Sequence, residues 1–126
     1  MRTILITDDD KLFRWALRQS LEEAGFRVLE ADRVSSARAR MLSEDVDCAV
    51  FDHDLPDGSG FDLLDGEARE KPCCPVIFLT AHPTDEGRAR ARQLGAFAYL
   101  SKLDDFDKVV EVVLAALRAV AGEPRA

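Results

Sequence analysis

The chain has 126 residues, which is enough for one domain with a single hydrophobic core. Its net charge of −7 argues against direct nucleic-acid binding by this domain, and no apolar run approaches the roughly 20 residues that span a bilayer. The three cysteines are an odd number, and Cys73-Cys74 lacks the second pair that a zinc site needs. These features favour reduced thiols and a cytoplasmic location.

Apolar runs alternate with helical patterns along the whole chain. The expected strands are 3–7, 26–30, 46–51, 76–79 and 96–100. The expected helices are 11–24, 35–42, one that starts near residue 61, 84–94 and 104–121. A turn is expected at 56–60, where Gly and Pro gather, and 122–126 is expected to be a tail or the start of a linker after a domain at 1–121. Five such units predict an α/β fold with a parallel sheet between two layers of helices.

Polar residues follow four of these strands directly. They are Asp8-Asp9-Asp10, Asp52-His53-Asp54, Thr80 and Ser101-Lys102. Because the carboxyl ends of parallel strands meet at one edge of a sheet, we expect Asp8, Asp9, Asp52, Thr80 and Lys102 to share one crevice. Such a set suits a divalent cation and a phosphoryl group. Each residue also has a structural interpretation: Asp10 as the cap of the first helix, Asp57 as a turn residue, Lys102 as a solvated lysine.

The strand-end motifs resemble those of the receiver domain of two-component response regulators, the CheY-like family. They are ILITDDD at 4–10, FDHDLPDGSG at 51–60, FLTA at 78–81 and LGAFAYLSK at 94–102. The resemblance extends from Ile4 to about Leu117. It implies a flavodoxin-like doubly wound fold, (βα)5, with strand order 2-1-3-4-5.

The resemblance also implies roles for the acids. Asp52 would be the nucleophile that accepts a phosphoryl group and becomes an aspartyl phosphate. Asp9 and Asp52 would hold Mg²⁺ through carboxylate oxygens, with Asp8 supporting through water and Asp54 contributing its backbone carbonyl. Mg²⁺ prefers hard oxygen ligands and would relieve the repulsion among these carboxylates.

Lys102 and Thr80 would contact the phosphoryl oxygens, Lys102 by its charge and Thr80 by its hydroxyl. Tyr99 is expected to couple to this change by turning inward, with a tyrosine at the sheet edge and its hydroxyl in water as the alternative. His82, two positions after Thr80, is expected to tune the lifetime of the phosphate. Leu103 departs from the proline usual in the family, so we expect a trans bond and an altered loop, which puts the reach of Lys102 in question.

The expected partners are a sensor histidine kinase or phosphotransfer protein, and an output domain or downstream protein. Homodimerisation through the last two helices and the strand between them is a further expectation. The domain would catalyse its own phosphorylation and slow dephosphorylation rather than act as a conventional enzyme. Two alternatives remain: a receiver-like interaction module that works without phosphate, and a haloacid-dehalogenase-type phosphohydrolase that uses Asp52 and Asp54 as its DxD pair.

Overall fold

The computed structural model describes residues 1–64 and 74–120. Its centre is a five-stranded parallel sheet with the order β2-β1-β3-β6-β7. The strands are β1 (Thr3–Thr7), β2 (Arg27–Ala31), β3 (Cys48–Phe51), β6 (Val76–Thr80) and β7 (Ala98–Ser101). Since β6 and β7 are the fourth and fifth strands of this sheet along the chain, the order is the expected 2-1-3-4-5.

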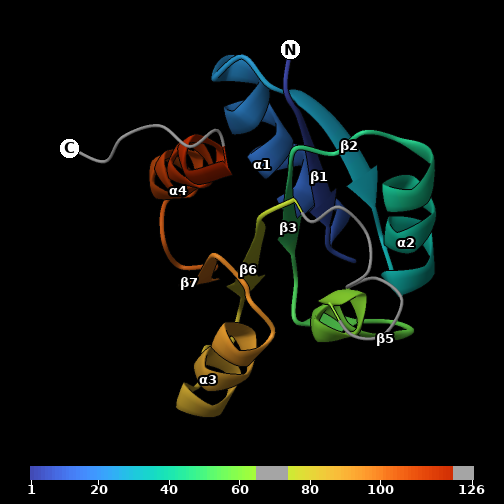
Figure 1. The fold of residues 1–126 in the computed structure, drawn as a ribbon, viewed down its shortest axis with the longest axis vertical. Helices are drawn as coiled ribbons and strands as arrows, with labels where there is room; N and C mark the ends of the chain where they lie inside the picture. Colours follow the sequence, from blue (N-terminus) through green and yellow to red (C-terminus); the bar gives the residue numbers. More distant parts are fainter. Residues whose placement is uncertain (65–73, 121–126) are drawn as a thin grey trace.

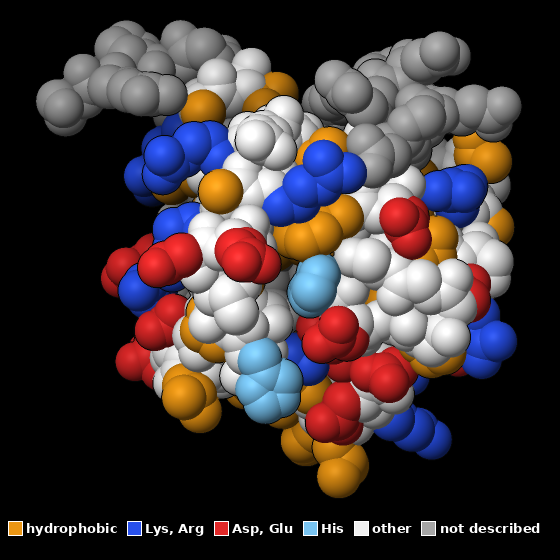
Figure 2. Space-filling view, turned by 90° about the horizontal axis from the view of Figure 1, so that it is seen from below, with side chains coloured by type: hydrophobic (Ala, Val, Ile, Leu, Met, Phe, Trp, Pro, Cys, Tyr) orange, Lys and Arg blue, Asp and Glu red, His pale blue; other side chains and the backbone are white. Residues whose placement is uncertain are grey.

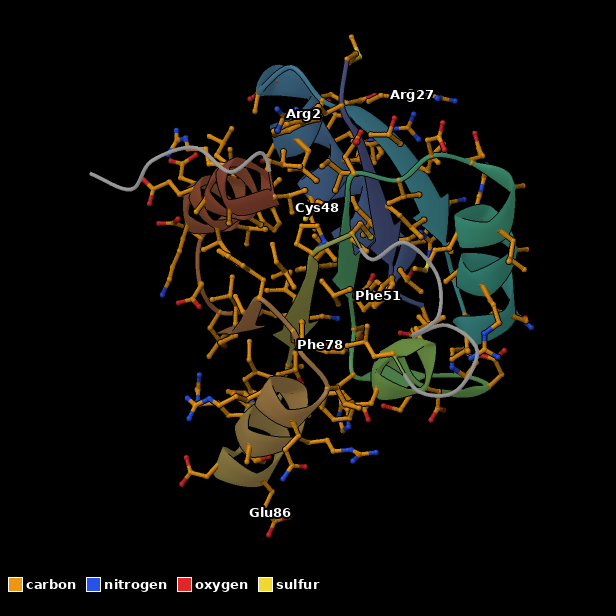
Figure 3. The ribbon with its side chains drawn as sticks, in the orientation of Figure 1. Arg2, Arg27, Cys48, Phe51, Phe78 and Glu86 are labelled. Carbon is orange, nitrogen blue, oxygen red and sulfur yellow. The ribbon has the colours of Figure 1, made fainter. Side chains whose placement is uncertain are left out.

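Helices cover both faces of the sheet (Figure 1). One face packs on α1 (Lys11–Glu23) and α4 (Phe106–Val120) around a core that includes Cys48. The other face packs on α2 (Val34–Ser43), the 3-10 helix η1 (Gly60–Leu64) and α3 (Asp85–Gln93). Phe51 and Phe78 lie in this second core, with ring centroids 6.3 Å apart (Figure 3). The strands are apolar on both sides because both faces are covered.

Local signals in the sequence explain where the helices begin and end. Asp10 caps α1, as expected: its carboxylate accepts hydrogen bonds from the amides of Leu12 and Phe13, at 3.0 and 3.1 Å. Gly25 and Gly95, just after α1 and α3, have φ of 95° and 85°. Glycine reaches this left-handed region without a Cβ penalty, which is why both helices stop there.

The segment after β3 differs in detail from the expectation. The turn at 56–60 is part of a small antiparallel hairpin of β4 (Asp54–Leu55) and β5 (Gly58–Ser59). The helix expected from about residue 61 begins as the 3-10 turn η1. Its continuation past Leu64, together with Cys73, the end of the last helix at 121 and the tail at 122–126, lies outside the described residues.

Asp57 lies in the turn of this hairpin, as expected, and also reaches a distant helix. Its carboxylate accepts hydrogen bonds from the amides of Val34 (2.6 Å) and Ser35 (3.0 Å), at the start of α2. Desolvation raises the pKa of Asp57, but these hydrogen bonds outweigh it and leave the pKa below its usual value. The loop that follows Asp52 is therefore tied to α2.

No helix in the two described ranges combines the length and apolar composition that crossing a membrane requires.

Candidate functional site

Two buried aspartates lie just beyond neighbouring strands of the sheet. The amide of Asp52 donates to the carbonyl of Thr7 at 2.9 Å, and the amide of Asp8 donates to the carbonyl of Ala31 at 3.1 Å. These bonds continue the β1–β3 and β1–β2 ladders by one residue. Asp8 is 2% exposed and Asp52 is 7% exposed. The sheet itself thus brings two carboxylates to its carboxyl edge.

Asp9 completes a group of three carboxylates. One oxygen each from Asp8, Asp9 and Asp52 lies within 4.8 Å of the others, and Asp9 is exposed to solvent. Figure 2 looks onto this edge of the molecule, where acidic side chains gather beside the two histidines. A set made only of carboxylate oxygens, with one side open to water, fits a hard cation such as Mg²⁺.

Asp54 does not belong to this carboxylate group. Its side chain is 73% exposed, and Oδ1 lies 3.4 Å from Nδ1 of His53. Its backbone amide donates to Oδ1 of Asp52 at 3.3 Å. Asp54 therefore meets the site through its backbone and not through its carboxylate.

Lys102 reaches into the acidic group from the end of β7. Its Nζ lies 2.6 Å from Oδ2 of Asp8 and 3.1 Å from Oδ2 of Asp52. The same ammonium lies 4.6 Å from the ring centroid of Phe13, and that ring packs edge-on against Phe106 with centroids 5.7 Å apart. Helical spacing in the sequence accounts for Phe13 as an apolar residue of α1 but gives no sign of this contact with a charged group.

The departure at Leu103 does not keep Lys102 from the acids. No peptide bond of the described residues is cis, as expected for this position. Two hydrogen bonds hold the backbone around Lys102. The amide of Leu103 donates to Oγ of Ser101 at 3.0 Å, and the amide of Lys102 donates to the carbonyl of Thr80 at 2.8 Å. Leu103 is 91% exposed.

The site is electrostatically unbalanced. Burial, and then the charge of Asp8, raise the pKa of Asp52, and the contact with Lys102 only partly offsets them. Burial lowers the pKa of Lys102, but its pairing with Asp8 and Asp52 outweighs that and leaves the pKa raised. One ammonium thus serves two buried carboxylates and leaves excess negative charge, which favours a further cation.

Thr80 and Tyr99, on the neighbouring strands β6 and β7, each accept a hydrogen bond from the loop that leads into α3. Thr80 is 1% exposed, and its hydroxyl oxygen accepts a hydrogen bond from the amide of exposed His82 at 3.1 Å. Tyr99 is 8% exposed and points inward, with its hydroxyl oxygen accepting from the amide of Thr84 at 3.2 Å. Within the described residues no hydrogen bond joins Thr80 to Asp52.

The fold and these strand-end residues agree with one known family. The family profile named response regulator receiver domain matches residues 4–114. The chain belongs to the response regulator receiver domain family. This receiver domain has the family's five-stranded parallel sheet, so the expected fold class and resemblance are confirmed.

Two bacterial regulators illustrate the sequence similarity. The receiver domain is 32% identical over 115 residues to the DNA-binding transcriptional regulator NtrC of Rhizobium meliloti, covering 91% of this chain and 24% of NtrC. It is 32% identical over 114 residues to the photosynthetic apparatus regulatory protein RegA of Cereibacter sphaeroides, covering 90% of this chain and 62% of RegA. The chain therefore spans less than two thirds of either relative.

A solved structure gives the same result for the fold. The receiver domain superposes on the CheY-like response regulator receiver domain protein of Methanospirillum hungatei JF-1 with a TM-score of 0.91 at 28% identity. The match covers 98% of this chain and 99% of that protein. The likeness therefore covers the sheet and the edge at which the acids gather.

Proposed function

We propose that this receiver domain is a phosphoacceptor switch in which Asp52 takes a phosphoryl group from a sensor histidine kinase or phosphotransfer protein. The observation that carries the proposal is the meeting of Asp8, Asp9, Asp52 and Lys102 at one edge of the sheet. Cys48 is not in a disulfide, which supports a cytoplasmic location.

The chemistry follows from the charges at this edge. A carboxylate oxygen of Asp52 forms a bond to phosphorus while the bond from phosphorus to the donor atom breaks. Asp9 and Asp52, with Asp8, supply the oxygen ligands for Mg²⁺, which when bound neutralises charge on the phosphoryl oxygens. Lys102, already beside Asp52, pairs with a phosphoryl oxygen and orients the group.

The conformational response would begin at Thr80. Its hydroxyl exchanges the hydrogen bond from the His82 amide for one to a phosphoryl oxygen, and the loop into α3 moves with it. Tyr99 would move with this loop, because its hydroxyl oxygen accepts a hydrogen bond from the amide of Thr84 in the same loop. His82, whose amide donates that first hydrogen bond to Thr80, would tune the lifetime of the phosphate.

The change would be passed on through α3, β7 and α4 to an output domain, a downstream protein or a second copy of the chain. The chain covers 24% of NtrC and 62% of RegA, so both regulators contain further sequence outside the matched part. NtrC is a DNA-binding transcriptional regulator, and we propose transcription control by a separate output domain as the setting for this switch. A ligand shifts such an equilibrium only by its different affinity for the two states.

The phosphohydrolase alternative requires Asp54 as a general acid close to Asp52. The Asp54 carboxylate is exposed and lies beside His53 instead. An interaction module without phosphate would have no need for three carboxylates and a lysine held in contact at one edge. Both alternatives are outcomes of the test that follows.

Beryllofluoride with Mg²⁺ mimics an aspartyl phosphate and tests the switch without turnover. We expect amide shifts at residues 80–99 as well as around Asp52, and none in Asp52→Asn. A silent wild-type spectrum would support the phosphate-independent module. Efficient hydrolysis of simple phosphomonoesters, lost in Asp54→Asn, would support the phosphohydrolase.

A further inference from the structure

A largely buried arginine on α1 holds the backbone at the start of the acidic group. The side chain of Arg14 is 14% exposed. Its Nη1 donates to the carbonyl of Asp8 at 2.6 Å, and its Nε donates to Oε1 of Glu30 at 3.0 Å. The guanidinium therefore joins the end of β1 to a carboxylate on β2.

Glu30 presets the orientation of this guanidinium. It lies in β2 between Leu29 and Ala31, and its second oxygen accepts from Nη1 of Arg18 at 2.7 Å. Desolvation raises the pKa of Glu30, but the two arginines outweigh it and leave the pKa below its usual value. An ionised Glu30 and a planar donor fork fix where the remaining nitrogen of Arg14 points.

The carbonyl that Arg14 holds belongs to the peptide unit between Asp8 and Asp9. Because that unit is planar, the direction of the carbonyl also sets where the Asp9 side chain starts. Other polar groups of Asp8 also have partners. Its Oδ1 accepts a hydrogen bond from the amide of Asp10 at 2.9 Å, and its amide donates to the carbonyl of Ala31 at 3.1 Å. Across 1–64 and 74–120, the exposed Asp9 carboxylate has no hydrogen bond or ion pair, so only its backbone places it.

We propose that Arg14 is a positioning residue for the cation site, which it serves by fixing the Asp8–Asp9 peptide so that the Asp9 carboxylate faces Asp8 and Asp52. The inference rests on the proposed function, since it concerns the Mg²⁺ that would sit there. Arg14 itself touches neither the cation nor the phosphoryl group.

Charge and positioning predict opposite effects for the loss of Arg14. Removing a positive charge near three carboxylates should strengthen Mg²⁺ binding if electrostatics alone decides. Removing a residue that orients a ligand weakens metal binding, usually by about 10-fold or more. Arg18→Gln is the matched control, because Arg18 loses the same charge and the same partner, Glu30, but does not contact Asp8.

The test is a Mg²⁺ titration followed by amide NMR of the whole chain. We expect Arg14→Gln to raise the Mg²⁺ dissociation constant about 10-fold, and Arg18→Gln to leave it unchanged or lower it. Arg14→Lys keeps the charge but loses the fork, so it should also weaken binding, and it carries the comparison if Arg14→Gln does not fold. Saturating Mg²⁺ should return the rate of phosphorylation by acetyl phosphate to the wild-type value in these variants.

Arg14 variants that bind Mg²⁺ as tightly as Arg18→Gln would overturn the positioning role. Weaker binding accompanied by a maximal rate that high Mg²⁺ fails to restore would also overturn it, since Arg14 would then affect more than the cation. Failure of the wild type itself to bind Mg²⁺ or take up phosphate would instead contradict the proposed function.

Discussion

The Nζ of Lys102 lies 3.1 Å from Oδ2 of Asp52, although the two residues are 50 positions apart in the chain. The same ammonium lies 2.6 Å from Asp8, so it is the nearest positive charge to both buried carboxylates. We therefore propose two functions for Lys102: it balances the acids before a cation binds, and it later pairs with the phosphoryl group.

Lys102→Met separates these two functions. Without the ammonium, Asp8 and Asp52 are left for the cation alone, so Mg²⁺ should bind about 10-fold more tightly, which corresponds to about 1.4 kcal/mol. The response of residues 80–99 to beryllofluoride should weaken, because among the described residues no other ammonium lies beside Asp52 to orient the mimic for Thr80. Lys108→Met, which removes a charge paired with Asp104, is the control and should change neither property. Weaker Mg²⁺ binding in Lys102→Met would contradict the idea that Lys102 and Mg²⁺ compete for Asp8 and Asp52.

Asp52→Asn should stabilise the protein in the absence of divalent cations. The pKa of Asp52 is raised by burial and by Asp8, so its charge costs folding free energy near neutral pH. We expect the free energy of unfolding to rise by about 1 kcal/mol, measured with urea in EDTA. Asp54→Asn, an exposed control, should stay within about 0.5 kcal/mol of wild type.

The sign of the pH dependence follows from the direction of that shift. Below the pKa of unfolded aspartate, about 3.9, both states are protonated and the ionised carboxylate costs nothing. As pH rises through the higher pKa of the folded state, the cost appears and the wild type falls behind Asp52→Asn. A gap between the two proteins that widened toward acid pH would show that the shift runs the other way.

Gly87 controls whether Tyr99 can stay turned inward. A Cβ at Gly87 would collide with the Tyr99 hydroxyl and also press on Oγ1 of Thr84 at 3.0 Å. Gly87→Ala should therefore destabilise the protein by about 1–3 kcal/mol, or drive Tyr99 outward. Tyr99→Phe removes the colliding hydroxyl, so the double variant should recover much of the loss in urea unfolding. Full additivity of the two changes would contradict the contact.

Cys48 should resist alkylation as long as the protein is folded. Its side chain is fully buried in the core under α1 and α4, and burial raises the pKa of its thiol from 9.0 to about 12. Iodoacetamide near pH 8 should modify half-buried Cys74 before Cys48, as read by peptide mass spectrometry, and urea should abolish the difference. Equal rates for the two thiols in native protein would contradict this burial.

The same shift predicts weaker folding in alkali. The unfolded thiol ionises near its ordinary pKa and the folded one does not, so stability falls as pH rises from 9.0 toward 12. Relative to Cys48→Ala, the wild type should lose about 2 kcal/mol at about pH 10.5. A constant difference between the two proteins from neutral to alkaline pH would rule this out.

The sheet and its acidic edge could be predicted because they depend on local patterns. Apolar runs that end in Asp8, Asp52 and Thr80 define strand ends, and parallel strands bring those ends together. The cap at Asp10 follows from the same kind of reading, since a cap bonds only to amides two and three residues away.

Contacts between distant side chains could not be predicted in this way. Asp57 bonds to the start of α2, 23 and 22 positions before it, and nothing local in a turn sequence indicates that partner. The pairing of Arg14 with Asp8 was missed as well. A usable signal did exist, because Glu30 is an acid between the buried apolar residues Leu29 and Ala31 of β2, and a carboxylate in that setting needs a cationic partner.

The proposed switch depends on covalent, Mg²⁺-dependent phosphorylation of Asp52. Intact-mass spectrometry after incubation with acetyl phosphate and Mg²⁺ measures this step. We expect a species heavier by one phosphoryl group that disappears with EDTA and is absent from Asp52→Ala. No heavier species in the wild type, or the same species in Asp52→Ala, would contradict it.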